Sequence, residues 1–389
     1  MTPDNDAAIV GLGITEMGKV YGRSAASFAA EAVLLACADA GLRLDEVDGL
    51  LTNAGMTPGV GLSLQRELGM RDLRLLSEVQ GYGSSAGSMV SLAAMAVGSG
   101  MAIAVACVFA DAPLTAGVGA GEAYAGTARR PTGFQALPAA VGLYGGNPYY
   151  ALAARRHMER YGTTSEQLGA VAVSTREWAL KNPRAQMRKP MALADHQNSR
   201  MITAPLHLFD CCLVSNGGIA VIVTTAARAR DLSQPPVHVL GWAQAHPGYT
   251  LSRESAFGLI SGAAQSGPEA LKMAGVSVAD VDVREIYDCY TYTTLITLED
   301  YGFCAKGEGG ALAESGALGP GGCLPTNTGG GQLSGYYMWG MTPLSEAVIQ
   351  ARGAGGDRQV PKHDIVLVSG NGGVLDHHAT LVLGSHQRS

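Results

Sequence analysis

The sequence predicts an α/β protein built from two related halves, and an internal repeat is the main reason. Residues 31–52, EAVLLACADAGLRLDEVDGLLT, match EALKMAGVSVADVDVREIY, which begins at residue 269. A short apolar segment precedes each copy, AAIVGLGIT near the start and VHVLGWAQ from residue 237. Each unit is therefore expected to form a strand, a helix, a turn and a second strand. We expect two such halves, residues 1–235 and 236–389.

The helices of the two copies share their ends. Apolar residues recur at helical spacing before Gly41 and before Gly275, and a glycine at that place is a typical helix stop. The short apolar runs that follow predict strands. The same alignment places Asp48 on Asp282. A shared ending of this kind favours duplication over a chance likeness of two amphipathic helices.

An insertion rich in Tyr, Arg, Pro and Gly is expected between the halves, at about residues 111–205, where it would cap the core. Helices are predicted from Tyr149 to Tyr161, opened by Pro148, and from Ser165 to Leu180, with Ser165 as N-cap. Five basic side chains are candidates to meet the phosphates of a nucleotide-bearing substrate, the alternative being a solvated surface: Arg129, Arg130, Arg184, Arg188 and Lys189.

Composition excludes several classes of function. The 389 residues are 47% hydrophobic and 15% charged, which suits a folded globular protein. Lys and Arg number 27 against 33 Asp and Glu, giving a formal charge of -6, so nucleic acid is not an expected partner. The N-terminus MTPDNDAAIV lacks a basic start and an apolar signal core, and we expect a cytoplasmic protein without membrane attachment. Seven cysteines without a CxxC pair are expected to be reduced: Cys37, Cys107, Cys211, Cys212, Cys289, Cys304 and Cys323.

Short motifs offer one alternative and exclude two others. GSSAG fits the GxSxG pattern of a nucleophile at a sharp turn and would make Ser85 the nucleophile of a hydrolase, with Asp288 and then His377 or His378 downstream. That hydrolase fold, however, has no internal duplication. The N-terminal GLGITEMG lacks the third glycine of a dinucleotide fingerprint, so no nicotinamide cofactor is expected. The nine histidines show no HxxxH or HExxH spacing, so no metal site is expected.

Several longer stretches, taken together, resemble the thiolase superfamily, specifically its sterol carrier protein X-type branch, which includes proteins described as lipid-transfer proteins. The resemblance covers nearly the whole chain. It is carried by AAIVGLGITEMGK, YGTTSEQLGAVAV, NPRAQMRKPM, SRMITAPLHLFDCCLVSNGGIAVIVTT, EIYDCYTYTTLITLEDYGFCAKGEGG, LPTNTGGGQLSGYYMWGM and SGNGGVLDHHATLVLG. It implies the thiolase fold, with duplicated βαβαβ halves in a five-layer αβαβα sandwich, and a homodimer.

Three departures from the family pattern argue against ordinary thiolytic transfer as the activity of this chain. Acyl-transferring members carry a nucleophilic cysteine where this chain has QGYGSSAGSMV, so the position falls on Gly83 or Ser84. The family's histidine after NTGGG is matched best by Tyr337. The second cysteine of the C-terminal glycine-rich loop is replaced in SGNGG. A serine hydroxyl is a poor substitute for a thiol because it is far less acidic and needs a positioned base.

This pattern resembles the aldolase subgroup of the branch, whose steroid side-chain-cleaving enzymes split a β-hydroxyacyl-CoA into a ketone and propionyl-CoA or acetyl-CoA. Retro-aldol cleavage needs a base for the β-hydroxyl, a stabilised enolate and an acid for the α-carbon, but no covalent intermediate. We expect Tyr337 and Tyr287 to supply the acid and base, with Tyr292 in reserve and Asp288 orienting a phenol or a water. No cofactor is expected beyond the CoA thioester.

The resemblance also implies residues around the enolate and a partner. Substrate or oxyanion contacts are expected from Ser84, Asn327, Gly330, Gly331, Gly372, Gly373 and His378. A small OB-fold protein is expected to join the homodimer in a heterotetramer. Two other functions stay open at this point: a serine-dependent acyl-CoA hydrolase or acyltransferase, and a non-catalytic acyl-CoA or sterol-binding subunit.

Overall fold

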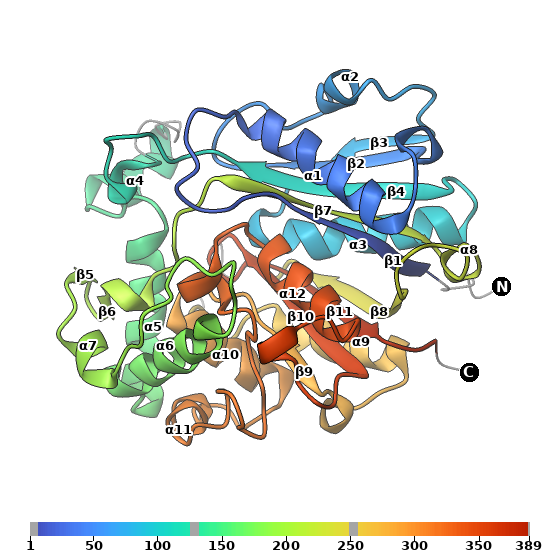
Figure 1. The fold of residues 1–389 in the computed structure, drawn as a ribbon. Helices are drawn as coiled ribbons and strands as arrows, with labels where there is room; N and C mark the ends of the chain where they lie inside the picture. The colour runs from blue at the N-terminus through green and yellow to red at the C-terminus, as the bar shows by residue number, and fades with distance from the viewer. Residues whose placement is uncertain (1–6, 125–131, 249–255, 388–389) are drawn as a thin grey trace.

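The computed structural model describes residues 7–124, 132–248 and 256–387, and within them nine strands form one mixed sheet (Figure 1). The first half supplies β1 (Ala7–Ile14), β2 (Gly49–Ala54), β3 (Leu75–Glu78), β4 (Ala104–Asp111) and β7 (Gly217–Thr225). The second half supplies β8 (Val237–Ala245), β9 (Val283–Glu285), β10 (Ile365–Gly372) and β11 (His377–Gly384). Their order is β3-β2-β4-β7-β1-β8-β11-β10-β9. The halves meet where β1 pairs with β8, through Ala8 and Ile9.

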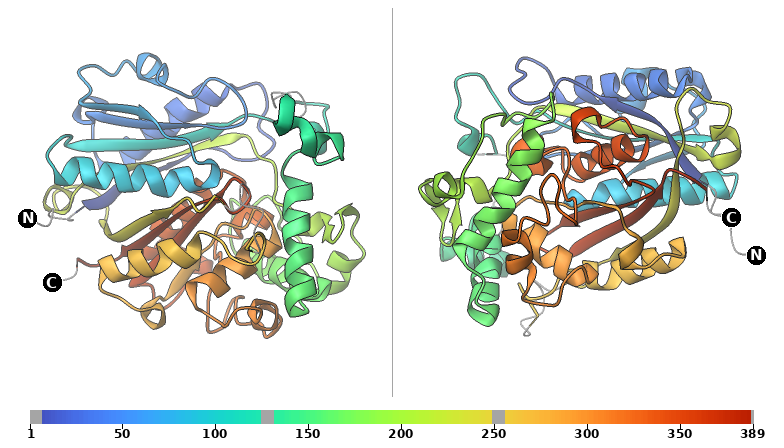
Figure 2. Two further views of the ribbon diagram at one scale, coloured as in Figure 1. Left: turned by 180° about the vertical axis from the view of Figure 1, so that it is seen from behind. Right: turned by 60° about the horizontal axis from the view of Figure 1, so that its bottom comes forward.

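Helices cover both outer faces and fill the space between the two halves of the sheet. The outer helices are α1 (Ala25–Ala40), which packs on β1, β4 and β7, and α9 (Ala263–Ala274), which packs on β8 and β11 with α10 (Thr291–Tyr301) beside it. In the middle, α3 (Ser85–Gly98) and α12 (Met341–Ala351) each contact strands of both halves (Figure 2). The predicted layers, helix, sheet, helix, sheet and helix, are therefore present.

Equivalent glycines let each outer helix lie close to its strand. A Cβ on Gly11 in β1 would lie 2.2 Å from a backbone carbonyl oxygen of α1, and a Cβ on Gly241 in β8 would lie 2.2 Å from one of α9. Both helices end at left-handed glycines, Gly41 with φ of 73° and Gly275 with φ of 65°. The two predicted helix stops are confirmed, and the repeat extends to these close contacts.

Equivalent aspartates tie each repeat to the strand next to it. Asp48 accepts hydrogen bonds through Oδ1 from the amides of Ile103 (2.7 Å) and Ala104 (3.0 Å), where β4 begins. Asp282 accepts one through Oδ2 from the amide of Ile365 (2.9 Å), where β10 begins. The predicted pairing of Asp48 with Asp282 is thus a structural equivalence, which supports duplication.

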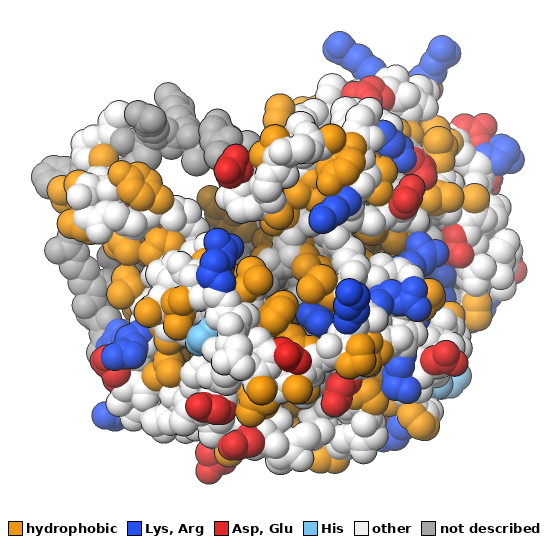
Figure 3. All heavy atoms as spheres, turned by 60° about the vertical axis from the view of Figure 1, so that its left-hand side comes forward, with side chains coloured by type: hydrophobic (Ala, Val, Ile, Leu, Met, Phe, Trp, Pro, Cys, Tyr) orange, Lys and Arg blue, Asp and Glu red, His pale blue; other side chains and the backbone are white. Residues whose placement is uncertain are grey.

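The predicted insertion lies between β4 and β7 and packs on the second half. It contains α4 (Leu137–Ala140), α5 (Gly146–Tyr161), α6 (Ser165–Leu180), α7 (Leu193–Gln197) and the hairpin of β5 (Met201–Thr203) and β6 (Leu206–His207). Helix α6 contacts α10 and α11 (Gly309–Glu314). On this side the surface is hollowed next to α4, and hydrophobic side chains gather there (Figure 3). Arg129 and Arg130 lie outside the described residues.

The predicted N-cap of α6 is wrong by one residue. Thr164, not Ser165, has extended backbone, and its hydroxyl accepts from the amide of Gln167 at 3.3 Å. The Gln167 side chain accepts from the Thr164 amide in return, at 3.2 Å. This reciprocal pair satisfies two amides at the helix start, and Ser165 already has helical geometry inside the helix.

Two further observations concern the described residues as a whole. None of their helices is both long and apolar enough to cross a membrane. All seven cysteines are free thiols. The cytoplasmic location remains a prediction.

Candidate active site

Two glycine-containing segments, the loop before α12 and the end of β10, converge on the turn that precedes α3. A Cβ on Gly340 would lie 2.2 Å from the carbonyl oxygen of Gly83, and one on Gly370 would lie 2.6 Å from the same oxygen. A Cβ on Gly372 would lie 2.2 Å from the carbonyl oxygen of Gly81. The glycines are required because backbone packs directly on backbone here. This packing joins the start of α3 to the end of β10 and to the loop before α12.

Tyr287 lies against Gly83 itself. It follows β9, and its ring occupies the space into which a side chain at position 83 would project, since a Cβ there would lie 2.2 Å from the ring atoms Cε2 and Cζ. The same Cβ would lie 2.2 Å from the backbone carbonyl oxygen of Asn371, so no side chain larger than hydrogen fits at position 83 between that oxygen and the ring. The hydroxyls of the two serines that follow Gly83 form hydrogen bonds within the turn. Ser84 is buried and donates from Oγ to the carbonyl oxygen of Gly81 (2.7 Å), and Ser85 accepts through Oγ from the amide of Gly81 (2.8 Å).

Tyr337 brings a second phenol to Tyr287. Tyr287 is buried, whereas Tyr337 is half-buried. Burial, and then the Cys289 thiol, raises the pKa of Tyr287 well above its ordinary value, and a hydrogen bond with the Tyr337 side chain offsets part of that rise. Burial, and then the Tyr287 phenol, raises the pKa of Tyr337 well above its ordinary value. Both phenols therefore keep their protons at neutral pH, and the pair can act as donor, acceptor or proton relay.

Two thiols that the sequence reasoning missed adjoin the phenols. Cys212 lies opposite Cys289, and its amide donates to the Cys289 carbonyl oxygen at 3.0 Å. The Tyr337 side chain is close enough to Cys212 to offset part of the rise in the pKa of that thiol. Burial raises the pKa of Cys289 to about 12 and that of Cys212 well above its ordinary value, so neither thiol is a thiolate nucleophile at neutral pH.

Helix α5 of the insertion supplies a third tyrosine. The ring of Tyr150 packs against that of Tyr290, with centroids 4.5 Å apart, and Tyr290 donates from its hydroxyl to Oδ1 of Asn147 in the first turn of α5. Asn371 donates from Nδ2 to the Tyr150 hydroxyl at 3.1 Å. These contacts connect the insertion to β10 and to the loop after β9. In the sequence, Tyr150 belongs to the Pro-Tyr-Tyr run near the start of α5, and that run does not indicate a contact with β10.

Asp288 anchors the loop that carries Tyr337. It accepts hydrogen bonds from the backbone amides of Gln332 (Oδ1, 2.7 Å) and Leu333 (Oδ2, 3.4 Å), and burial raises its pKa to about 7. Gly331 has φ of 52°, and a Cβ there would lie 2.0 Å from Oδ2 of Asp288. Asp288 therefore acts on the backbone of the loop and holds the π-helix of residues Gly331–Gly335 that leads to the second phenol.

The remaining loop residues shape the same segment. Asn327 has φ of 54° and accepts through Oδ1 from the amide of Ile286 (2.7 Å), next to Tyr287. Gly330 has φ of 90°, a conformation that favours glycine. Gly372 closes β10 opposite His377. Asn327 and Gly330 therefore set the path of the backbone that leads to Tyr337, and Gly372 ends a strand.

Comparisons with known proteins show the family of this chain. A family model described as "Thiolase C-terminal domain-like" matches residues 243–385. A "Steroid side-chain-cleaving aldolase" of Thermomonospora curvata is 39% identical over 375 residues, which cover 94% of this chain and 95% of that protein. The chain belongs to the thiolase superfamily. Within it, the chain falls in the aldolase subgroup of the sterol-carrier-protein-like branch.

Two more relatives of this superfamily match the chain over nearly its whole length. A "17-hydroxy-3-oxo-4-pregnene-20-carboxyl-CoA lyase" of Mycobacterium tuberculosis is 39% identical over 380 residues, which cover 94% of this chain and 96% of that protein. A solved "Ltp2-ChsH2(DUF35) aldolase" superposes with a TM-score of 0.88 at 37% identity and covers 100% of both chains. The thiolase fold predicted from the sequence is confirmed, and the interpretation of GSSAG as part of a hydrolase of another fold is wrong.

Two predicted site residues lie away from the phenol pair of this thiolase-superfamily chain. Tyr292 is buried in α10 and donates from its hydroxyl to the carbonyl oxygen of Gly258 at 2.5 Å. His378 is buried in β11, with Nε2 at 2.9 Å from the Tyr301 hydroxyl, and burial lowers its pKa to about 3. His377 points to the opposite face, as strand alternation predicts, and contacts His246.

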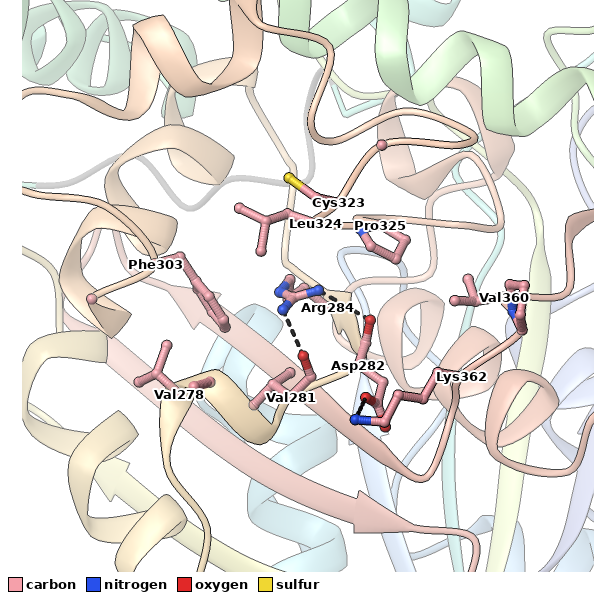
Figure 4. Close-up of a pocket in the computed structure, with 14 residues that line it drawn as sticks. Val278, Val281, Asp282, Arg284, Phe303, Cys323, Leu324, Pro325, Val360 and Lys362 are labelled. Atoms are coloured by element: carbon pink, nitrogen blue, oxygen red, sulfur yellow. Dashed lines mark hydrogen bonds and ion pairs between the residues drawn. The ribbon is translucent and has the colours of Figure 1, made fainter.

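A surface hollow of about 710 Å³ lies elsewhere in the second half (Figure 4). Arg284 and Phe303 stand on one side of it and Lys362, paired with Asp282, on the other. None of the predicted site residues lines it. Among the described residues there is also no group of three or more His, Cys, Asp or Glu side chains that could hold a metal ion.

Proposed function

We propose that this protein catalyses retro-aldol cleavage of a β-hydroxyacyl-CoA with a tertiary hydroxyl on a steroid or other polycyclic ring. The products are a ketone and propionyl-CoA or acetyl-CoA. One observation carries the proposal: the ring of Tyr287 fills the space beside Gly83, and its phenol lies close enough to that of Tyr337 for each to shift the pKa of the other. A covalent nucleophile at position 83 has no room, whereas a pair of protonated phenols suits proton transfer. The names of the aldolase and lyase relatives, both 39% identical, support the same reaction.

The proposed step balances without a cofactor. As the bond between the α-carbon and β-carbon breaks, its electron pair becomes the thioester enolate, and one phenol accepts the proton of the β-hydroxyl while its own proton passes to the other phenol. That other phenol donates its original proton to the α-carbon, so Tyr287 and Tyr337 both end the step protonated. The substrate hydroxyl becomes the ketone, and its proton is accounted for on the acyl-CoA.

The partner and assembly state form part of this proposal. The solved relative is described as an aldolase that includes a DUF35 component. We propose that this chain forms a homodimer that joins a small OB-fold partner in a heterotetramer. The measurement is the mass of the chain, alone and mixed with such a partner, by light scattering.

The experiment that tests the reaction uses the chain with and without that partner. A steroid CoA thioester with a tertiary β-hydroxyl is incubated in D₂O, and products are followed by mass spectrometry. We expect a ketone and an acyl-CoA that carries one deuteron at the α-carbon, with no mass added to the protein. An acylated Ser84 or Ser85 would favour serine-dependent transfer, and tight binding without cleavage in the complex would favour a non-catalytic subunit.

A further inference from the structure

An exposed aromatic ring stands directly before Gly83. Tyr82 is 49% exposed, although Gly83 and Ser84, which share its short 3₁₀ turn, are buried. Its ring centroid lies 5.9 Å from that of Trp339 and 6.4 Å from that of His377, and the His377 ring is within 18° of parallel. The Tyr82 ring is therefore supported by two neighbours and leaves part of its apolar surface open to solvent.

The position of this ring is fixed by its backbone. Tyr82 has φ of 54° and Trp339 has φ of 46°, a left-handed conformation that is unusual for bulky residues. The Tyr82 amide donates to Oε1 of Gln80 at 3.0 Å, and the Trp339 ring stacks on Phe109 with centroids 5.0 Å apart. Such conformations persist only where the surroundings hold them, and they gather at ligand sites.

The ring also lies within reach of the reacting atoms. Consecutive Cα atoms are about 3.8 Å apart, and the Tyr287 ring lies against the next residue, Gly83. In the proposed substrate the tertiary β-hydroxyl is on the ring, so the β-carbon is itself a ring atom and the ring system begins at the bond that breaks. A ring system placed with its β-hydroxyl at the phenols therefore has Tyr82 as a neighbour.

We propose that Tyr82 is a specificity-determining residue that supports the polycyclic part of the substrate on its open face. This inference rests on the proposed function and adds the residue that distinguishes a polycyclic substrate from a small one. Tyr82 does not take part in proton transfer, because that role belongs to the phenol pair next to it.

The test compares two CoA thioesters that share a tertiary β-hydroxyl, one on a steroid ring and one on a single cyclohexane ring. Variants Tyr82→Ala and Tyr82→Phe are assayed in the complex, with Tyr21→Ala, at a tyrosine that is 43% exposed, as the matched control. We expect Tyr82→Ala to lower kcat/KM for the steroid thioester about tenfold through KM and to leave the cyclohexane thioester unchanged. Tyr82→Phe and Tyr21→Ala should match the wild type.

The outcomes separate this inference from the function on which it rests. An equal loss for both thioesters, or no loss for the steroid, would overturn the role of Tyr82. A changed molecular mass of Tyr82→Ala in light scattering would also overturn it, because the ring would then serve a contact between chains. If the wild type cleaves neither thioester, the proposed function fails and not the assignment of Tyr82.

Discussion

The ring of Tyr287 occupies the space where a side chain on Gly83 would lie, 2.2 Å from the position of a Cβ. Position 83 is one of the two candidates for the family nucleophile, and the other, Ser84, uses its hydroxyl within the turn. The backbone carbonyl oxygen of Asn371 lies equally close to that Cβ position, so a nucleophilic side chain at position 83 would meet both the Tyr287 ring and the end of β10.

Gly83→Ala tests this exclusion directly. We expect the added methyl group to displace the Tyr287 ring and the backbone of Asn371, lower kcat at least 100-fold and destabilise the fold by about 1–3 kcal/mol through overpacking. Gly121→Ala is the matched control, because nothing lies within 4 Å of a Cβ there. Steady-state kinetics and thermal unfolding check both variants, and full activity of Gly83→Ala would contradict the placement of the ring.

Tyr337→Phe keeps the ring and removes one phenol of the pair. We expect kcat to fall by about 10²–10⁴ with little change in stability, because proton transfer by a positioned group contributes roughly that factor. Tyr287→Phe should show a loss of the same order. Product formation is measured by mass spectrometry, and unchanged turnover in either variant would remove that phenol from the mechanism.

Tyr292→Phe should behave differently from those two variants. Its hydroxyl donates to the Gly258 carbonyl oxygen, away from the phenol pair, so the expected effect is a loss of about 1 kcal/mol in stability and turnover within twofold of the wild type. Chemical denaturation and kinetics on the same preparation check this. A loss of turnover as large as that of Tyr337→Phe would show that Tyr292 takes part in catalysis.

Asp288 should make the stability of the protein depend on pH. Burial raises its pKa from 3.8 to about 7, so between these values the native state binds a proton more tightly than the unfolded state. The stabilisation from this group is complete below about pH 4 and is lost as the pH rises to about 7, with a slope of at most about 1.4 kcal/mol per pH unit.

Asp288→Asn supplies the comparison for that slope. The free energy of unfolding of the wild type, minus that of the variant, should fall from pH 4 to pH 7 in urea denaturation. Equal slopes would mean that Asp288 does not titrate in this range. The variant should also lose turnover, because the amides of Gln332 and Leu333 lose their carboxylate partner and the Tyr337 loop loosens.

The repeat predicts equal effects in the two halves. Gly11→Ala and Gly241→Ala each place a Cβ 2.2 Å from a helix carbonyl oxygen, so each should destabilise the protein by about 1–3 kcal/mol or more. Thermal unfolding measures both against Gly121→Ala. A neutral result at either position would mean that α1 or α9 can move away from its strand at little cost.

The sequence by itself determined the duplicated α/β fold and the absence of a cysteine from the segment QGYGSSAGSMV. Both follow from local rules: apolar periodicity marks the helices and strands, Gly41 and Gly275 stop helices in either half, and a missing residue type is visible without coordinates. Family position also singled out Tyr337 and Tyr287. The duplication is visible because both copies obey the same packing rule between a helix and its strand.

Only the tertiary structure decided which side chains of the site contact one another. Tyr287 and Gly83 are some two hundred residues apart in sequence, and their contact depends on the middle helix layer touching both halves. The same long-range packing brings Cys212 and Tyr150 to the phenols and turns Asp288 toward loop amides. Sequence patterns report neighbours along one element, whereas these contacts arise between elements that only the complete fold brings together.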